Sequence, residues 1–189
     1  MLIRDNSEHY GFVSQILHWG MAAAIFALFA LGWWMVRLDY YDPYYTRAPA
    51  LHRSTGILIL IALVLRSAWR ISNTKPLRAD LTPFERTASR YVHGAFYALL
   101  FALTISGYLI STSDGRAIDV FGWFEVPSIS QNKQLADAAG LWHRWIAYTV
   151  IALAALHATA AMKHAYVRHR SRSGTPDRTC DSNSHGSPA

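Results

Sequence analysis

Four long apolar stretches constrain the fold of this chain more than any other feature. They span about residues 15–38, 51–72, 90–112 and 141–165. Each holds about the 20 mostly apolar residues that an α-helix needs to cross a bilayer. Helices that are apolar on most faces lie either in a large protein core or in lipid, and 189 residues are too few to bury four of them in a soluble core. The sequence therefore predicts an all-α integral membrane four-helix bundle in contact with lipid.

Local signals extend two of these helices beyond the membrane. Thr82 can cap a helix, Pro83 suits the first helical position and Glu85 completes a capping box. The third helix is therefore predicted to begin near Pro83. Asn132 is predicted to cap the fourth helix, which then continues to about Val167.

Two features interrupt the apolar pattern. The stretch 51–72 carries Arg53, Arg66 and Arg70 near its ends, and the long arginine stems are predicted to bring these charges to the interface. Residues 113–131 mix glycine and proline with aromatic residues. This mixture predicts a loop at the headgroup level, where aromatic rings prefer to lie.

The basic residues orient the chain across the membrane. Four spans put both termini on one side, and two thirds of the 18 Lys and Arg residues flank that side. Because basic flanks stay in the cytoplasm, both termini are predicted to be cytoplasmic. The net charge of +6 is then a topology signal, and no nucleic-acid partner is expected. Residues 1–168 form the predicted membrane domain, and 169–189 form a polar, disordered cytoplasmic tail.

Histidines are the main candidates for chemistry. Nine are present, and six of them lie in or at the ends of the predicted spans. Ionisable groups inside a membrane are costly, so they are functional candidates. A single such histidine is commonly a hydrogen-bonded packing residue, but six at related depths need another explanation. These six are His18, His52, His93, His143, His157 and His164.

Depth in the membrane sorts four of these histidines into two pairs. His18 lies near the start of the first span and His157 near the end of the fourth, so both lie towards the cytoplasm. His52 and His143 open the second and fourth spans at the outer side. His143 and His157 are 14 residues apart, which is about 21 Å of helix and leaves both on nearly one face.

Two pairs of imidazoles on facing helices suit two haems with bis-histidine ligation. Haem iron takes axial imidazole ligands, and helical bundles build cofactor sites between facing helices. Zinc prefers three or four ligands clustered at one point, which pairs separated by most of a bilayer do not provide. A haem-free metal or proton transporter that uses the membrane histidines remains a further alternative.

His93 and His164 are second candidates on the cytoplasmic side. They can contact haem propionates, hydrogen-bond a quinone carbonyl or relay protons. The alternative is that both are interfacial histidines in water. His93 is also the main rival of His18 as an iron ligand.

Two arginines directly follow the outer histidines in sequence. Arg53 comes after His52, and Arg144 comes after His143. Both can reach the outer surface, where they can bind haem propionates or draw small anions towards the outer haem. The alternative is that they anchor helix ends at the interface.

The pattern resembles the bacterial cytochrome b561 family over roughly residues 10–168. The matching features are His18-Trp19 in the first span, His52 followed by the run Gly56–Arg66, and the fourth-helix pattern from Trp142 to Tyr166. The resemblance implies four helices and two b haems in the inner membrane. By residue, it implies His18 with His157 for the cytoplasmic-side haem and His52 with His143 for the periplasmic-side haem.

One member of that family is a superoxide oxidase, which passes electrons from periplasmic superoxide to ubiquinone. By this analogy the chain is expected to be an enzyme that transfers electrons between a periplasmic donor and ubiquinone. Superoxide would be guided by Arg47, Arg53, Lys133 or Arg144, and His164 would serve the quinone. The alternative is a cytochrome b electron-transfer subunit of a dehydrogenase or hydrogenase, or a partner of a periplasmic carrier.

Overall fold

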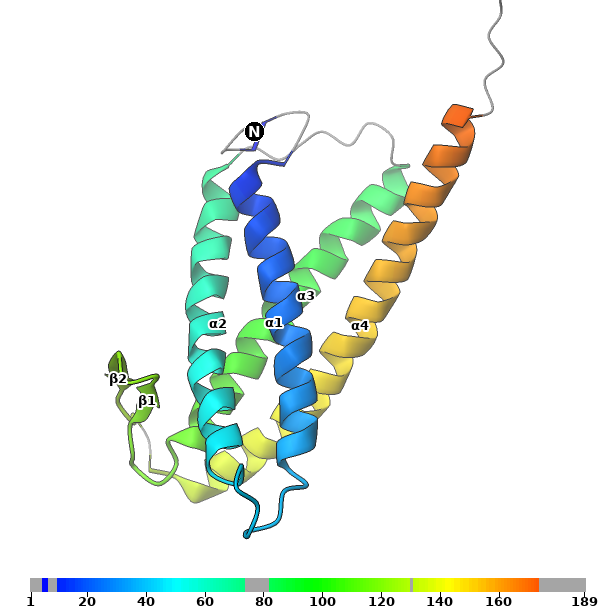
Figure 1. The fold of residues 1–189 in the computed structure, drawn as a ribbon. Helices are drawn as coiled ribbons and strands as arrows, with labels where there is room; N and C mark the ends of the chain where they lie inside the picture. The colour runs from blue at the N-terminus through cyan, green and yellow to red at the C-terminus, as the bar shows by residue number, and fades with distance from the viewer. Residues whose placement is uncertain (1–4, 7–9, 74–81, 130, 174–189) are drawn as a thin grey trace, which may run out of the picture. The chain divides into compact units, whose positions relative to one another are not determined.

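Four long helices and one short β-hairpin make up the fold of the residues that the structure describes. The computed structural model describes residues 5–6, 10–73, 82–129 and 131–173. All four helices are long and apolar enough to cross a membrane, which confirms the all-α membrane fold. In chain order the elements are α1 (Phe12–Met35), α2 (Arg47–Ser72), α3 (Pro83–Ser111), β1 (Ile118–Val120), β2 (Phe124–Val126) and α4 (Lys133–Ser173) (Figure 1).

The chain divides into two compact units, and the boundary falls inside α4. The first unit is Met1–Ala152 and the second is Leu153–Ala189. In the second unit the described residues continue α4 to Ser173. The predicted tail, 169–189, thus begins within the last residues of α4, and 174–189 lie outside the described residues.

All four helices contribute to the core of the first unit. Met21, Leu63, Leu100 and Val150 form one buried cluster, with one side chain from each helix. Within its membrane-crossing window, 28% of α2 is buried, against 6% of α1 and 11% of α3. α2 is therefore the most enclosed of these three helices, and the others leave most of their apolar surface to lipid.

The predicted starts of α3 and α4 are confirmed. The Thr82 hydroxyl accepts a hydrogen bond from the Glu85 backbone N–H at 3.3 Å, and the Glu85 carboxylate accepts one from the Thr82 N–H at 2.9 Å. Together these two bonds make a capping box. At α4, the Asn132 side-chain oxygen accepts from the Leu135 N–H at 3.0 Å.

Part of the segment predicted as a loop forms an antiparallel hairpin. β1 pairs with β2 in the register Ile118↔Val126 and Val120↔Phe124. The two turn residues, Phe121 and Gly122, have φ angles of 54° and 72°. Such turns favour Asn, Asp or Gly at both positions, so a phenylalanine at the first position hid this hairpin from sequence reasoning.

The hairpin packs against α2 rather than standing free of it. Ile118 and Val120 are buried in a cluster with Ile57 of α2. The Ser54 hydroxyl, also on α2, donates a hydrogen bond of 2.8 Å to the Asp119 carbonyl. The connection between α3 and α4 is therefore fixed to the N-terminal part of α2 (Figure 1).

Candidate functional site

Two histidines predicted to form the outer pair lie side by side in the first unit. His52 is in the second turn of α2, and His143 is in α4. Their ring centroids are 6.3 Å apart and the ring planes meet at 70°. Both residues are half-buried. The structure thus brings together two imidazoles that are 91 positions apart in the sequence.

The His143 ring is oriented by hydrogen bonds to α3. Its Nδ1 lies 3.0 Å from the Leu103 carbonyl oxygen and 3.1 Å from the Ser106 hydroxyl. A carbonyl oxygen only accepts, so Nδ1 carries the proton and Nε2 keeps its lone pair. Histidines that bind metals commonly donate their second ring N–H to a carbonyl in this way.

A glycine of a neighbouring helix faces each of the two imidazoles. A Cβ atom added to Gly32 of α1 would lie 3.1 Å from Cε1 of His52, and one added to Gly107 of α3 would lie 3.0 Å from Cε1 of His143. Real Cβ atoms are rarely found so close to another atom. These glycines therefore let α1 and α3 approach the histidines. The sequence alone does not show which glycine faces which histidine, because that depends on helix packing.

The donor set of the outer pair fits the axial positions of a haem. With metal–imidazole bonds of about 2 Å, two ring centroids on opposite sides of one iron are about 6 Å apart, close to the 6.3 Å observed. The buried Nδ1 of His52 has no hydrogen-bond partner among the described residues, so its ring is held by packing. Within the same residues no three His, Cys, Asp or Glu side chains gather as a metal site, whereas haem iron needs only two from the protein.

At the other end of the first unit, His18 contacts an arginine. The Nη2 of Arg66 lies 3.1 Å from the Nδ1 of His18, and its Nε donates to the Tyr97 hydroxyl at 3.2 Å. Arg66 is half-buried. From the sequence, the long stem of this arginine was expected to reach the interface; in the structure its guanidinium bonds to side chains of α1 and α3.

The structure describes the remaining three histidine candidates in unequal detail. His93 has its Nδ1 2.6 Å from the Ser89 carbonyl oxygen, so this nitrogen carries the proton. His157 lies on α4 in the second unit. Its pairing with His18 joins the two units and stays a prediction. The side chain of His164 lies outside the described residues.

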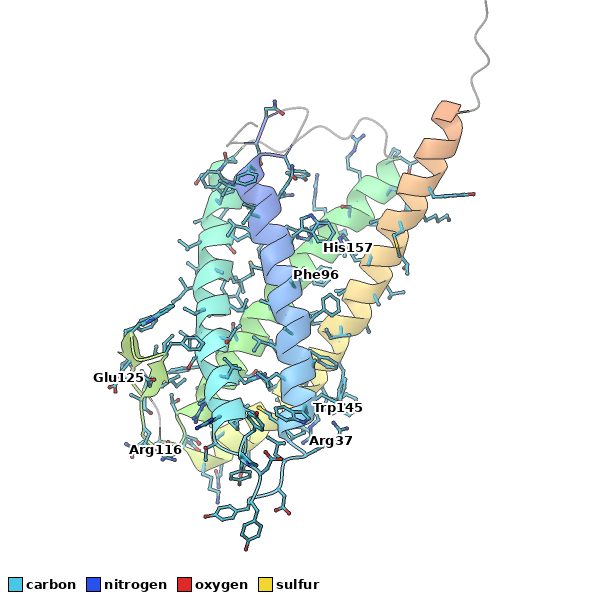
Figure 2. All side chains as sticks on the ribbon, viewed as in Figure 1. Arg37, Phe96, Arg116, Glu125, Trp145 and His157 are labelled. Atoms are coloured by element: carbon cyan, nitrogen blue, oxygen red, sulfur yellow. The ribbon has the colours of Figure 1, made fainter. Side chains whose placement is uncertain are left out.

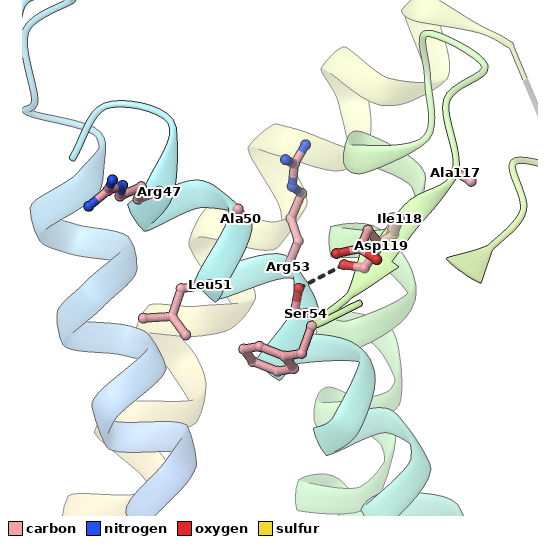
Figure 3. Close-up of a pocket in the computed structure, with 9 residues that line it drawn as sticks. Arg47, Ala50, Leu51, Arg53, Ser54, Ala117, Ile118 and Asp119 are labelled. Atoms are coloured by element: carbon pink, nitrogen blue, oxygen red, sulfur yellow. Dashed lines mark hydrogen bonds between the residues drawn. The ribbon is translucent and has the colours of Figure 1, made fainter. Parts of the chain in front are cut away.

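A cavity opens between the first turns of α2 and the hairpin, and its lining includes neither His52 nor His143. It has a volume of about 400 Å³, and its lining includes Arg47, Arg53, Asp119 and Phe121 (Figure 3). Both arginines are exposed. Within the described part of the chain neither forms an ion pair or a hydrogen bond. The lining thus carries two arginines against the one carboxylate of Asp119, which leaves an excess of positive charge.

Other basic residues predicted or found at this end are exposed or already engaged. Arg144 and Lys133, both predicted anion guides, are exposed. Arg116 donates from Nε to the Asp114 carboxylate at 2.7 Å, and this hydrogen bond lowers the pKa of that carboxyl below its usual value. Arg37 lies over an aromatic ring of α1, 3.4 Å from its centre. Figure 2 shows Arg37 and Arg116 at the same end of the helices.

Two comparisons with known proteins agree. The family model described as prokaryotic cytochrome b561 matches residues 9–173. The chain is also 45% identical over 169 residues to cytochrome b561 homolog 2 of Escherichia coli strain K12, and that match covers 88% of this chain and 90% of the relative. The family match spans all four helices and the four histidines of the two predicted pairs.

Proposed function

This chain belongs to the prokaryotic cytochrome b561 family, and on that premise we propose that it is a di-haem oxidoreductase that carries electrons across the inner membrane. The family consists of membrane b-type cytochromes, so haem b and electron transfer are established for it at that level. The proposal adds the number of haems, the ligands, the donor and the acceptor. The observation that carries it is the 6.3 Å pairing of His52 and His143.

Four histidines would hold the two haems. His52 and His143 would bind the haem on the periplasmic side, and His18 and His157 would bind the one on the cytoplasmic side. A bound haem supplies reversible one-electron chemistry, and the protein supplies ligands, orientation and access. The bias of basic residues supports cytoplasmic termini, which would turn the His52 end of α2 towards the periplasm.

The proposed donor is superoxide and the proposed acceptor is ubiquinone. Each superoxide would lose one electron and leave as O₂, and two such electrons with two protons would reduce one quinone to quinol. Superoxide is a small anion, and an excess of positive charge around a cleft raises the local concentration of small anions. The two exposed arginines of the outer cavity, Arg47 and Arg53, support this assignment. For the quinone, the cytoplasmic-side candidates His93 and His164 keep the roles predicted from sequence.

Stopped-flow mixing of superoxide with the oxidised, haem-loaded protein tests the donor. Haem absorbance should show fast reduction, followed by reoxidation when a soluble ubiquinone analogue is present. Haems that dithionite reduces but superoxide does not would indicate the alternative, an electron-transfer subunit or a partner of a periplasmic carrier. A purified protein without haem would contradict both functions.

Charge reversal in the outer cavity should slow the reaction with superoxide. The double variant Arg47→Glu/Arg53→Glu is expected to lower the second-order rate constant about tenfold at low salt, because it replaces attraction by repulsion. Added salt should reduce the difference in rate constant between the wild type and the double variant, because it screens the charges. The rate constant is measured by stopped flow at several ionic strengths, in protein whose haem content is unchanged.

A matched control separates the cavity from the overall charge. Arg116→Glu changes the charge at the same end of the molecule, but Arg116 already pairs with Asp114 and does not line the cavity. It should reduce the rate constant less than twofold. An equal loss in Arg116→Glu and in either single variant, Arg47→Glu or Arg53→Glu, would refute a specific role for the cavity.

A further inference from the structure

Ser106 is a buried serine in the middle of α3, and its hydroxyl contacts the imidazole of His143. The same hydroxyl donates a hydrogen bond of 2.8 Å to the Leu103 carbonyl, one turn earlier in the helix. That bond uses the one hydroxyl proton, so towards Nδ1 of His143, 3.1 Å away, the Ser106 oxygen acts as an acceptor. Leu103, Ser106 and His143 thus form a closed triangle of hydrogen bonds.

The Ser106 oxygen adds an acceptor to the one that the Leu103 carbonyl already provides. A carbonyl oxygen has two lone pairs, so the Leu103 carbonyl can accept from Ser106 at 2.8 Å and from His143 at 3.0 Å together. The Nδ1 proton of His143 is therefore shared between two oxygen atoms. Acceptors on the second ring N–H of a histidine fix the ring and raise its basicity towards a metal.

His52 has no such support. Its buried Nδ1 has no hydrogen-bond partner in the described part of the chain, although its ring lies only 6.3 Å from that of His143. The two imidazoles proposed as ligands of the outer haem are therefore unequal. Among these contacts, the side-chain hydroxyl that can adjust electron donation to an iron lies on the His143 side.

We propose that Ser106 is a positioning residue that fixes the His143 ring and lowers the midpoint potential of the outer haem. This inference rests on the proposed function, because it assumes that His143 is an iron ligand. A more basic imidazole donates more charge to the iron, which stabilises the oxidised state, and hydrogen bonds around a ligand are one way in which proteins set haem potentials. Ser106 acts through His143 alone.

An optical redox titration of the purified, haem-loaded protein tests the proposal. In Ser106→Ala the outer haem should become easier to reduce, because Nδ1 of His143 loses one of its two acceptors. The ratio of reduced to oxidised outer haem should rise about threefold at a fixed potential, which corresponds to the free energy of one weak hydrogen bond. For a one-electron couple this is a shift of about 28 mV. The outer component is the one that disappears from the spectrum of His143→Ala.

Two more variants at this position separate the hydroxyl from the packing of the side chain. Ser106→Thr keeps a hydroxyl that can bond to a carbonyl one turn earlier in the helix, so it should recover at least half of the shift. Ser106→Cys keeps a side chain of similar shape, but its sulfur is a weak acceptor, so the potential should shift in the same direction as in Ser106→Ala. If Ser106→Ala does not retain the outer haem, Ser106→Cys decides the matter. Loss of this haem in Ser106→Thr as well would show that the site needs the size of serine rather than its hydroxyl, and would overturn the proposal.

Ser111→Ala is the matched control on the same helix. The Ser111 hydroxyl donates to the Gly107 carbonyl at 2.7 Å, and in the described residues it contacts neither imidazole of the outer pair. Both haem potentials should stay as in the wild type. An equal shift in Ser111→Ala and Ser106→Ala would assign the effect to the helix backbone and overturn the role of Ser106.

The outcomes separate this inference from the proposed function. Two haems with an outer potential that is unchanged or lower in Ser106→Ala would overturn the role of Ser106 and leave the di-haem function standing. A wild-type protein with fewer than two haems would instead overturn the proposed function.

Discussion

His52→Ala is expected to reduce the haem content from two per chain to one. The variant removes one of the two imidazoles whose centroids lie 6.3 Å apart, and a single remaining ligand holds a b haem weakly because no covalent bond retains it. In the proposed function, the haem at His18 would be separate and should stay bound. The measurement is the ratio of extracted haem to protein, together with the low-spin absorption bands of the reduced protein.

The same experiment at the other histidines tests the pairing. His143→Ala should lose the same spectral component as His52→Ala, whereas His18→Ala and His157→Ala should both lose the other component. His93→Ala should retain both haems. If His93→Ala loses a haem while His18→Ala does not, the pairing is wrong and His93 is the ligand.

Gly107→Val is expected to remove the outer haem without changing any histidine. A Cβ at this position would lie 3.0 Å from Cε1 of His143, and this ring cannot easily move away while its Nδ1 is bonded to the Leu103 carbonyl. The imidazole must therefore tilt, or α3 and α4 must separate. Haem content should fall from two towards one, as in His143→Ala. A titration of haem into the apoprotein would show the lost affinity directly.

The chain offers a control for this substitution on the same helix. Gly94 is also in α3, and nothing lies within 4 Å of a Cβ built there. Gly94→Val carries the same intrinsic cost of a β-branched residue in a helix, but it should keep both haems. If Gly94→Val and Gly107→Val lose haem equally, the effect comes from the helix and not from contact with His143.

The helices could be predicted because their signals are local. Runs of apolar residues define the spans, and the start of α3 follows from Thr82 and Glu85, which lie three positions apart. The pairing of His52 with His143 was predicted from depth alone, because side chains at equal depth on neighbouring helices can meet. Each of these inferences needs only the spacing of residues along one helix.

Features that depend on how the helices rotate against each other could not be predicted. When a helix is apolar on most faces, its apolar pattern does not show which face meets a neighbouring helix. The contacts of Gly32 and Gly107 with imidazoles were therefore not predicted. For the same reason the contact of Arg66 with His18 was not predicted. The hairpin was missed for a local reason, since Phe121 occupies a backbone conformation that its side chain seldom adopts.

The bond from the Ser54 hydroxyl to the Asp119 carbonyl makes the cavity between α2 and the hairpin part of the scaffold. One side of the cavity is the hairpin, which is bonded to α2, and the other side is formed by the arginines of α2 itself. The width of the opening therefore does not depend on the movement of a loop. In the proposed function, a small anion would therefore reach the cavity without waiting for a conformational change, so its rate of capture would depend on diffusion and on charge. Because Ser54 is two residues from His52, removing this hydrogen bond should disturb both the cavity and the neighbouring histidine.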